Sequence, residues 1–211
     1  MTTSLFMKKT IAQLVPHGSR VLDLGCGDGA MLEHLQKHRG CSGYGVELDD
    51  TNVLACARRG VEVLQLNLDQ GLKLFGDQSF DVVLQIDTLQ HLRNAETMLR
   101  ETARVGRIGI VSFPNFAHWP NRLNVLAGRM PVTRRLPYQW YDTPNIRVGT
   151  HADFEVLAEK NGCWNYQYKP CNKRFAGFIN LVSQPPQRNN GNYGPSDMIG
   201  RKSIQRLIVS I

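Results

Sequence analysis

The chain has 211 residues, of which 42% are hydrophobic and 20% are charged, so it is long enough to bury a sizeable core and is neither disordered nor fibrous in composition. It contains no run of about 18 apolar residues, the length that a helix needs to cross a bilayer, and its first residues are typical of an amphipathic helix rather than a secretory signal. The formal net charge of +7 permits an anionic partner without choosing its class. We therefore expect a cytoplasmic protein with no membrane partner.

The number and spacing of the cysteines bear on disulfide bonds and on zinc binding. The chain has five of them, widely spread, and no two form a C-x-x-C pair. An odd number with such spacing indicates neither a disulfide framework nor a zinc site. We expect reduced thiols and no bound metal.

In the first two-thirds of the chain, strand-like segments alternate with helix-like ones, which is typical of a parallel sheet with crossover helices. Apolar runs such as DVVLQI, rather than strict alternation, indicate strands that are covered on both faces. This pattern predicts strands at residues 20–24, 42–48, 61–67, 80–86 and 107–113, and helices at residues 28–38, 49–60 and 94–106.

The pattern changes after the fifth of these strands. Residues 114–150 carry five prolines and five aromatic residues, and the segment is too long for an ordinary connection. Such an insertion is usually a lid or a surface for a partner. The alternative is a structural flap whose aromatic side chains complete the core.

The last part of the chain is predicted to finish the sheet and then lose regular structure. A helix at 151–162 and strands at 163–169 and 175–183 bring the sheet to seven strands within one domain, residues 1–183. Residues 184–211 include a polar, turn-forming stretch without periodicity, and we expect an atypical, flexible tail there.

A glycine-rich loop follows the first predicted strand, in the sequence VLDLGCGDGA of residues 21–30. Such a loop presents unpaired backbone amides at a helix start, and its missing side chains let a ligand approach the backbone closely. The spacing also fits the G-x-G-x-x-A form of a dinucleotide-binding loop. Asp23 separates the two interpretations, because its carboxylate suits a ligand that bears a cation and would repel a pyrophosphate. The alternative is that Asp23 only caps loop amides.

The hydrophobic-acid-hydrophobic-Gly-x-Gly-x-Gly pattern resembles motif I of the class I S-adenosylmethionine-dependent methyltransferases, in which that acid serves the methionine end of the cofactor. A second acid is then expected at the end of the next strand, where a carboxylate can accept from both hydroxyls of a ribose. Glu47 occurs at that place, while Asp49 is better placed to cap the following helix. At the end of the third strand, the resemblance favours Asp69 beside the adenine, with Leu68 packing on the ring.

Catalytic groups are harder to identify. A general base is needed only where the methyl acceptor carries a proton that must leave. His91 and His118 follow the fourth and fifth predicted strands and are the titratable candidates, although each can equally be structural. The FPN sequence at 113–115 has the wrong order for the N-P-P-[YF] signature of amine methylation. We therefore assign no catalytic residue, and a nucleic-acid partner is disfavoured because no basic and aromatic platform is evident.

From about Val15 to about Gly162, the chain resembles the MetW family of methionine biosynthesis proteins. Motif I alone indicates only the superfamily, whereas SFPNFAHW and LPYQWYDTPNI narrow the resemblance to MetW. It implies an α/β fold, the Rossmann-like class I methyltransferase fold, with a mostly parallel seven-stranded sheet and helices on both faces. It also implies that the protein is an accessory partner of homoserine O-acyltransferase, the enzyme that activates homoserine. The W-P-N-L-F-G-E segment found near the C-terminus of family members is missing here.

These observations predict a regulatory subunit that binds S-adenosylmethionine or S-adenosylhomocysteine and docks on the acyltransferase through the insertion. Bound nucleoside is expected to change the affinity for that enzyme. The alternative is an active small-molecule methyltransferase whose insertion closes over the acceptor. The predicted cofactor-binding residues are Asp23, Gly25, Cys26, Gly27, Gly29, Glu47, Leu48, Leu68, Asp69 and Gln85.

Overall fold

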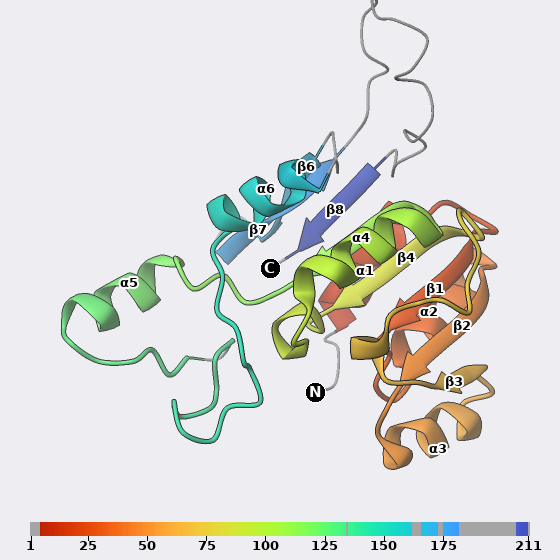
Figure 1. Cartoon of the computed structure of the whole chain (residues 1–211), viewed down its shortest axis with the longest axis horizontal. Coiled ribbons are helices and arrows are strands. Elements are labelled where there is room, and N and C mark those ends of the chain that lie inside the picture. Colours follow the sequence, from red (N-terminus) through yellow and green to blue (C-terminus); the bar gives the residue numbers. More distant parts are fainter. Residues whose placement is uncertain (1–4, 134, 162–165, 173–174, 182–205, 211) are drawn as a thin grey trace, which may run out of the picture.

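The computed structural model describes residues 5–133, 135–161, 166–172, 175–181 and 206–210. Their strands form one sheet in the order β3-β2-β1-β4-β5-β8-β6-β7 (Figure 1). Neighbours from β3 to β8 in this order are parallel, β8 is parallel to β6, and β7 runs antiparallel to both β6 and β8. The strands are β1 (Arg20–Leu24), β2 (Ser42–Glu47), β3 (Val63–Gln65), β4 (Phe80–Ile86), β5 (Gly106–Ser112), β6 (Tyr166–Asn172), β7 (Phe175–Leu181) and β8 (Arg206–Ser210).

The prediction of a mostly parallel α/β sheet is confirmed, but the number of strands is corrected. Seven strands were expected, and the described residues form eight. The additional strand is β8, an apolar RLIVS run that pairs with β5 on one side and β6 on the other. It lies in the segment for which the sequence predicts a flexible tail, and residues 182–205 of that region fall outside the described residues.

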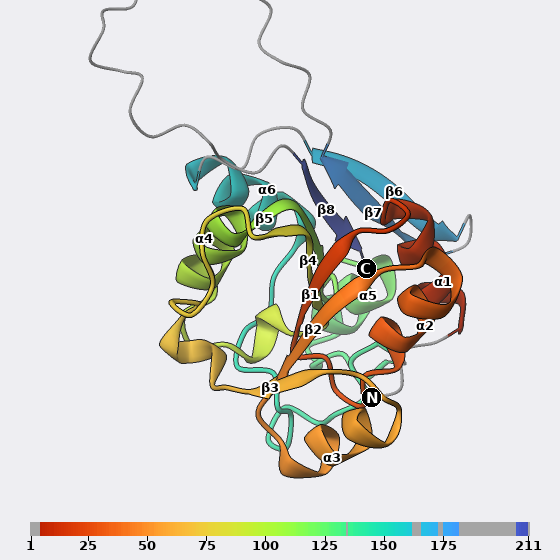
Figure 2. The same ribbon diagram turned by 90° about the vertical axis from the view of Figure 1, so that its right-hand side faces the viewer.

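Helices cover both faces of the sheet, as Figures 1 and 2 show. The helices α2, α3, α4 and α6 begin and end close to the predicted positions, whereas α5 lies in the insertion, where no helix was predicted. None of the described helices is long and apolar enough to span a membrane. The helices are α1 (Leu5–Leu14), α2 (Ala30–Arg39), α3 (Asp50–Arg58), α4 (Ala95–Val105), α5 (Trp119–Leu126) and α6 (His151–Lys160), with short 3-10 helices η1 (Leu68–Gln70) and η2 (Leu89–His91).

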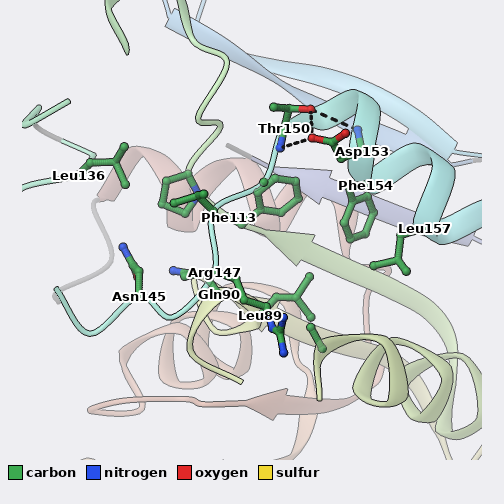
Figure 3. Close-up of a pocket in the computed structure, with 14 residues that line it drawn as sticks. Leu89, Gln90, Phe113, Leu136, Asn145, Arg147, Thr150, Asp153, Phe154 and Leu157 are labelled. Atoms are coloured by element: carbon green, nitrogen blue, oxygen red, sulfur yellow. Dashed lines mark hydrogen bonds between the residues drawn. The ribbon is translucent and has the colours of Figure 1, made fainter. Parts of the chain in front are cut away.

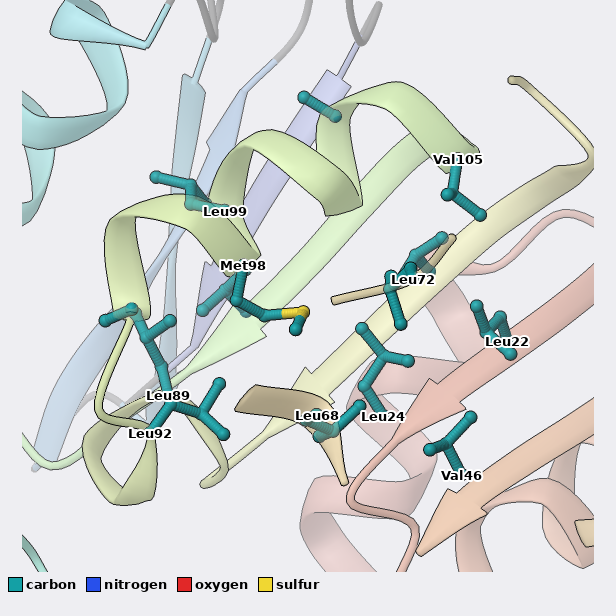
Figure 4. Packing of buried hydrophobic residues seen from close by; sticks show 14 of the residues in the cluster. Leu22, Leu24, Val46, Leu68, Leu72, Leu89, Leu92, Met98, Leu99 and Val105 are labelled. Carbon is teal, nitrogen blue, oxygen red and sulfur yellow. The ribbon is translucent and has the colours of Figure 1, made fainter. Parts of the chain in front are cut away.

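The core has two parts, one on each face of the sheet. On one face, α4 and α6 pack with η1 and η2 over β1, β4 and β5, and Figure 4 shows the resulting cluster around Leu24, Leu68 and Met98. On the other face, α1 and α2 pack against apolar residues of β1, β4 and β5 such as Val82 and Ile110. Because both faces of the central strands are buried, their apolar residues run without interruption.

The described residues of the insertion form one helix, α5, and otherwise irregular backbone. Its two ends are joined, since Asn115 forms an isolated parallel bridge with Gly149, and the Phe116 amide donates to the Gly149 carbonyl at 2.9 Å. The chain then enters α6 through a capping box, in which Thr150 and Asp153 bond to each other's backbone amides. The insertion therefore leaves and rejoins the domain at the carboxyl end of β5.

Candidate nucleoside-binding site

The predicted site lies where the strand order reverses. The strand β1 pairs with β2 on one side and with β4 on the other. The connection that follows β1 leads to β2, whereas the connection that follows β4 leads to β5 on the opposite side of the sheet. Open α/β sheets bind ligands in the crevice at such a switch point. The glycine loop follows β1 at this position, the Asp87–Thr88 segment follows β4, and Glu47 ends β2.

All three loop glycines have left-handed backbone, which favours glycine strongly, with φ of 72° at Gly25, 56° at Gly27 and 75° at Gly29. A Cβ atom on Gly25 would lie 2.6 Å from the Thr88 hydroxyl, and one on Gly29 would lie 2.9 Å from the Cys56 sulfur. A Cβ on Gly27 would meet nothing within 4 Å. The outer glycines thus permit close packing, while Gly27 faces open space that a ligand can use.

The loop is tied to both neighbouring strands. The amides of Gly25 and Cys26 donate to the Val46 carbonyl of β2, at 2.8 and 3.1 Å. On the other side, the Thr88 hydroxyl lies 2.9 Å from the Leu24 carbonyl. Thr88 was not among the predicted site residues, and the only signal for it in the sequence is its position just beyond β4. The loop backbone is consequently positioned before any ligand binds.

Asp23 is buried and has an unsatisfied oxygen. Its side chain is 2% exposed, and within the described part of the chain Oδ1 has no hydrogen-bond partner. In the sheet, Asp23 is in register with Gly45 and Leu84, neither of which offers a polar side chain. Burial, followed by the nearby charge of Glu47, raises the pKa of Asp23 to about 7. A cation placed beside this carboxylate would remove the penalty on its ionised form.

Glu47 lies at the predicted position at the end of β2, and its carboxylate binds three backbone amides. Oε2 accepts from Gly27 at 2.8 Å, while Oε1 accepts from Leu48 at 2.8 Å and from Asp49 at 3.1 Å. A carboxylate has roughly four acceptor directions. Both hydroxyls of a ribose can therefore be accepted only if one of these amides, such as that of Gly27, is released.

The alternative role considered for Asp49 is confirmed, because Asp49 is the N-cap of α3 and accepts from the Asn52 amide at 3.0 Å. Leu48, between these two acids, is 58% exposed. Its position leaves an apolar side chain at the edge of the predicted ribose site.

Leu68 and Asp69, the residues predicted to lie beside the adenine, follow β3. Leu68 is buried in the core with Leu24, and Asp69 Oδ1 accepts from the amides of Arg93 and Asn94 at 2.9 and 3.3 Å. Asp69 therefore holds the segment between β4 and α4. Its placement beside an adenine stays a prediction.

Two predicted residues point elsewhere or have an additional role. Gln85 is fully buried and its amide donates to the Thr102 hydroxyl of α4, so the structure does not bring it together with the other predicted residues. Cys26 lies under the loop with its sulfur 3.8 Å from that of Cys56. Burial, the largest cause, raises the pKa of both thiols, which therefore stay protonated.

The candidate bases do not form a catalytic cluster. His91 lies in the exposed part of η2, and His118 is the N-cap residue of α5 at the start of the insertion. Among the described residues, no group of three or more His, Cys, Asp or Glu side chains could hold a metal ion.

The insertion exposes many apolar side chains. Trp140 and Tyr141 are each 71% exposed and their rings pack edge to face, with centroids 5.7 Å apart. Their exposure argues against the structural-flap alternative, because these rings do not complete the core. The exposed insertion side chains are Trp119, Leu123, Val125, Leu126, Met130, Val132, Tyr138, Trp140, Tyr141, Ile146 and Val148.

Comparison with known proteins identifies relatives of the sequence. The family described as methionine biosynthesis protein MetW matches residues 7–167. A bifunctional methionine biosynthesis protein MetXA/MetW from Rhodopirellula baltica is 40% identical over 160 residues, which is 71% of this chain and 26% of that protein. Norajmaline N-methyltransferase from Rauvolfia serpentina is 30% identical over 105 residues, covering 46% of this chain and 36% of the relative. The chain thus spans about a quarter to a third of the length of these two relatives.

Solved structures share the fold. An S-adenosylmethionine-dependent methyltransferase from Archaeoglobus fulgidus has a TM-score of 0.58 at 19% identity, over 77% of this chain and 70% of that chain. Another from Thermotoga maritima has a TM-score of 0.54 at 20% identity, over 77% and 73%. At these identities the likeness shows the fold alone, and it confirms the predicted Rossmann-like class I methyltransferase fold.

Proposed function

Because this chain belongs to the MetW family of methionine biosynthesis proteins, we propose that it binds S-adenosylmethionine or S-adenosylhomocysteine and acts as a regulatory partner of homoserine O-acyltransferase in the cytoplasm. The observation that carries the nucleoside part is Asp23, a buried carboxylate with an unsatisfied oxygen at the end of β1, just before the glycine loop in which Gly27 faces open space. Structural neighbours that are S-adenosylmethionine-dependent enzymes support the same ligand class.

In this proposal each part of the site holds one part of the ligand. Asp23 stabilises the cationic methionine end, and the Gly25–Gly29 loop gives the nucleoside access to backbone. Glu47 accepts from the ribose hydroxyls, and the Leu68–Asp69 pair meets the adenine. When bound, S-adenosylmethionine supplies an electrophilic methyl group. Since no catalytic base is identified beside the loop, we assign the site a sensing role.

The partner is supported by the bifunctional relative, in which MetXA and MetW functions occur on one chain. The docking surface that we propose is formed by the exposed insertion side chains, with Trp140 and Tyr141 at its centre. Large aromatic side chains are frequent anchors of protein interfaces.

The structure offers a physical link between the two sites. The segment from Thr88 to Asn94 is held on the nucleoside side by Thr88 and by Asp69, which accepts from two of its amides. On the insertion side, the amides of Ile146 and Arg147 donate to the Gln90 carbonyl. A ligand that shifts this segment would change the insertion, and the resulting coupling must be reciprocal.

The experiment is a binding titration between this chain and homoserine O-acyltransferase, with and without saturating S-adenosylhomocysteine. We expect a complex whose Kd changes by about fivefold or more on addition of the nucleoside, since that is the lower end of typical coupling between two sites. An unchanged Kd would remove the sensing role, and the absence of a complex would remove the partner.

The docking surface is tested separately. The double variant Trp140→Ala, Tyr141→Ala should lose the complex, while Leu74→Ala is the matched control. Leu74 is 73% exposed but lies between η1 and β4, away from the insertion. A complex that persists in the double variant would contradict this choice of surface.

A further inference from the structure

The segment that follows β4 begins with a residue in a strained conformation, Asp87. Its φ of 52° lies in the left-handed region, which among the described non-glycine residues only Gln78 shares. Such backbone persists only where the surrounding structure enforces it, and it is frequent at ligand-binding positions. Asp87 comes directly before Thr88, which packs against Gly25 of the glycine loop. The strain therefore lies beside the proposed nucleoside site.

Neighbouring residues hold Asp87 by its backbone and by one side-chain oxygen. Its amide donates to the carbonyl and to the hydroxyl of Ser112, at 3.1 and 2.9 Å, and its carbonyl accepts from the Gln90 side chain at 2.8 Å. The hydroxyl of Ser112, a fully buried residue, donates to Asp87 Oδ1 at 3.1 Å. Because Asp87 itself is only half-buried, its carboxylate is fixed in place and still partly accessible.

Three carboxylates at this edge of the sheet have no cation to balance them. Asp23, Glu47 and Asp87 lie at or just beyond the carboxyl ends of the adjacent strands β1, β2 and β4. In the described part of the chain none of the three forms an ion pair. Asp28, the remaining acid of the glycine loop, is paired with Arg59 at 2.7 Å. The unpaired carboxylates therefore give the switch point a negative potential.

The amides of the glycine loop are already bonded within the protein. Those of residues 25–27 donate to β2, and that of Gly29 donates to the Cys26 carbonyl at 3.1 Å. The Ala30 amide, at the start of α2, donates to Asp28 Oδ1 at 3.2 Å. An anion at a helix start gains from amides that have no other acceptor. Here an anion would have to displace these acceptors, whereas a cation leaves them in place.

The neighbouring cavity, which Figure 3 shows, adds no free cation. It is lined by η2, the end of β5, the insertion and α6. Among the described residues that line it, Arg147 alone is basic, and its guanidinium donates to the carbonyls of Leu92 and Arg93. The Asp153 carboxylate at this cavity accepts from the Thr150 hydroxyl at 2.6 Å. The cavity therefore leaves the negative potential beside Asp87 in place.

We propose that the nucleoside site selects its ligand by charge and binds S-adenosylmethionine in preference to S-adenosylhomocysteine, with Asp87 as the specificity-determining residue. The two nucleosides differ in the methylsulfonium group, which carries a positive charge that the thioether lacks. Unpaired carboxylates attract that charge. Asp87 is assigned this role because it is partly accessible, whereas Asp23 is only 2% exposed. The inference rests on the function proposed above, and it makes the protein respond to the methyl donor rather than to its demethylated product.

The test is calorimetric titration of the full chain with S-adenosylmethionine, S-adenosylhomocysteine and sinefungin. Sinefungin has an ammonium group in place of the methylsulfonium, so it separates the effect of charge from that of the added methyl group. Even with the screening of bulk water, the attraction between two unit charges about 4 Å apart is worth about fivefold in affinity. We expect both charged ligands to bind at least about fivefold tighter than the thioether, and added salt should reduce this preference.

A charge-neutral variant tests the role of Asp87. Asp87→Asn keeps the size of the side chain, and asparagine also tolerates left-handed backbone. This variant should lose about fivefold of the preference for the charged ligands and should bind S-adenosylhomocysteine nearly as the unmodified chain does. Glu159→Gln is the matched control, because it removes an equal charge at an exposed position near the end of α6 and should keep the full preference. Thermal unfolding of each variant verifies that it is folded.

Three results would overturn the inference. They are equal affinity for S-adenosylmethionine and S-adenosylhomocysteine, binding of sinefungin no tighter than that of the thioether, and a full preference retained by folded Asp87→Asn. Each of them leaves nucleoside binding itself intact, so the proposed function would survive. If neither nucleoside binds to the unmodified chain, the proposed function fails together with this inference.

Discussion

The glycine loop and the insertion both follow carboxyl ends of central strands, yet they are built in opposite ways. In the loop, backbone amides are fixed to β2, the outer glycines leave no room for a Cβ atom, and Asp23 is almost fully buried. In the insertion, large apolar side chains such as Trp140 remain in water. A preorganised buried site suits a small ligand that must be recognised by a few polar groups. An exposed apolar surface suits a protein, which supplies the burial itself.

Substitutions can test this contrast through their effects on the free energy of unfolding and on binding. Changes in the loop should disturb folding and nucleoside binding together, because the same contacts serve both. Changes in the exposed insertion side chains should affect association with a partner and leave folding nearly untouched.

The largest effect is expected from Gly25→Ala. The alanine would have to keep the left-handed backbone of Gly25. Its Cβ would lie 2.6 Å from Thr88 Oγ1, which itself donates to the Leu24 carbonyl. Strain and overpacking should together lower the free energy of unfolding by about 3 to 4 kcal/mol and abolish nucleoside binding. Gly128→Ala is the matched control, because Gly128 also has left-handed backbone, with φ of 73°, but open space around it. It should cost only about 1 kcal/mol in urea unfolding. Equal costs would break the comparison.

The second effect concerns Asp23 and pH. With its pKa raised to about 7 in the folded state, Asp23 is neutral there at pH values at which the unfolded chain already ionises it. Its contribution to stability is therefore greatest at acid pH and is lost as pH rises toward and through 7. Asp23→Asn should match the unmodified chain at pH 4 and should be more stable than it at pH 8, by up to about 4 kcal/mol. Denaturant unfolding at both pH values measures this, and a variant destabilised at pH 8 would contradict the assignment.

A smaller effect is expected where the insertion is attached. Arg147→Ala removes hydrogen bonds to the carbonyls of Leu92 and Arg93 and should cost about 1 kcal/mol. Hydrogen exchange should accelerate at the amides of Ile146 and Arg147. Exposed Arg135, also in the insertion, provides the control variant Arg135→Ala, for which neither change is expected. Equal exchange in both variants would show that Arg147 is not an attachment point.

The smallest effect on folding is expected for Trp140→Ala with Tyr141→Ala. Both side chains are largely exposed, so the free energy of unfolding should change by less than about 0.5 kcal/mol. Thermal and urea unfolding provide the measurement. A loss of about 2 kcal/mol or more would restore the view that the insertion is a flap that completes the core.

The sequence predicts those features that depend on local pattern. Apolar runs located the central strands. The glycine spacing together with Asp23 and Glu47 placed the predicted nucleoside site at the switch point of the sheet, and nucleoside binding there stays a prediction. The cap at Asp49 was also expected, since an Asp just before a helix has few other roles.

Features that depend on pairing between distant segments were missed. Thr88 matters because it packs against Gly25, sixty-three positions earlier, and no local pattern reports that contact. Gln85 was assigned to the site because it lies near the end of β4, but strand alternation turns its side chain toward α4. The strand β8 is too short to recognise within a polar tail, and it exists through its pairing with β5.

The most direct test of the account is calorimetric titration of S-adenosylmethionine into the unmodified chain and Asp23→Asn between pH 6 and 8. We predict saturable binding to the unmodified chain. Its affinity should rise by up to about tenfold per pH unit as the pH is raised toward 7, because binding requires the ionised carboxylate. In Asp23→Asn, binding should be at least about tenfold weaker and independent of pH. Absence of binding to the unmodified chain, or the same affinity and pH dependence in the variant, would contradict the claim that this carboxylate forms the cationic end of a nucleoside site.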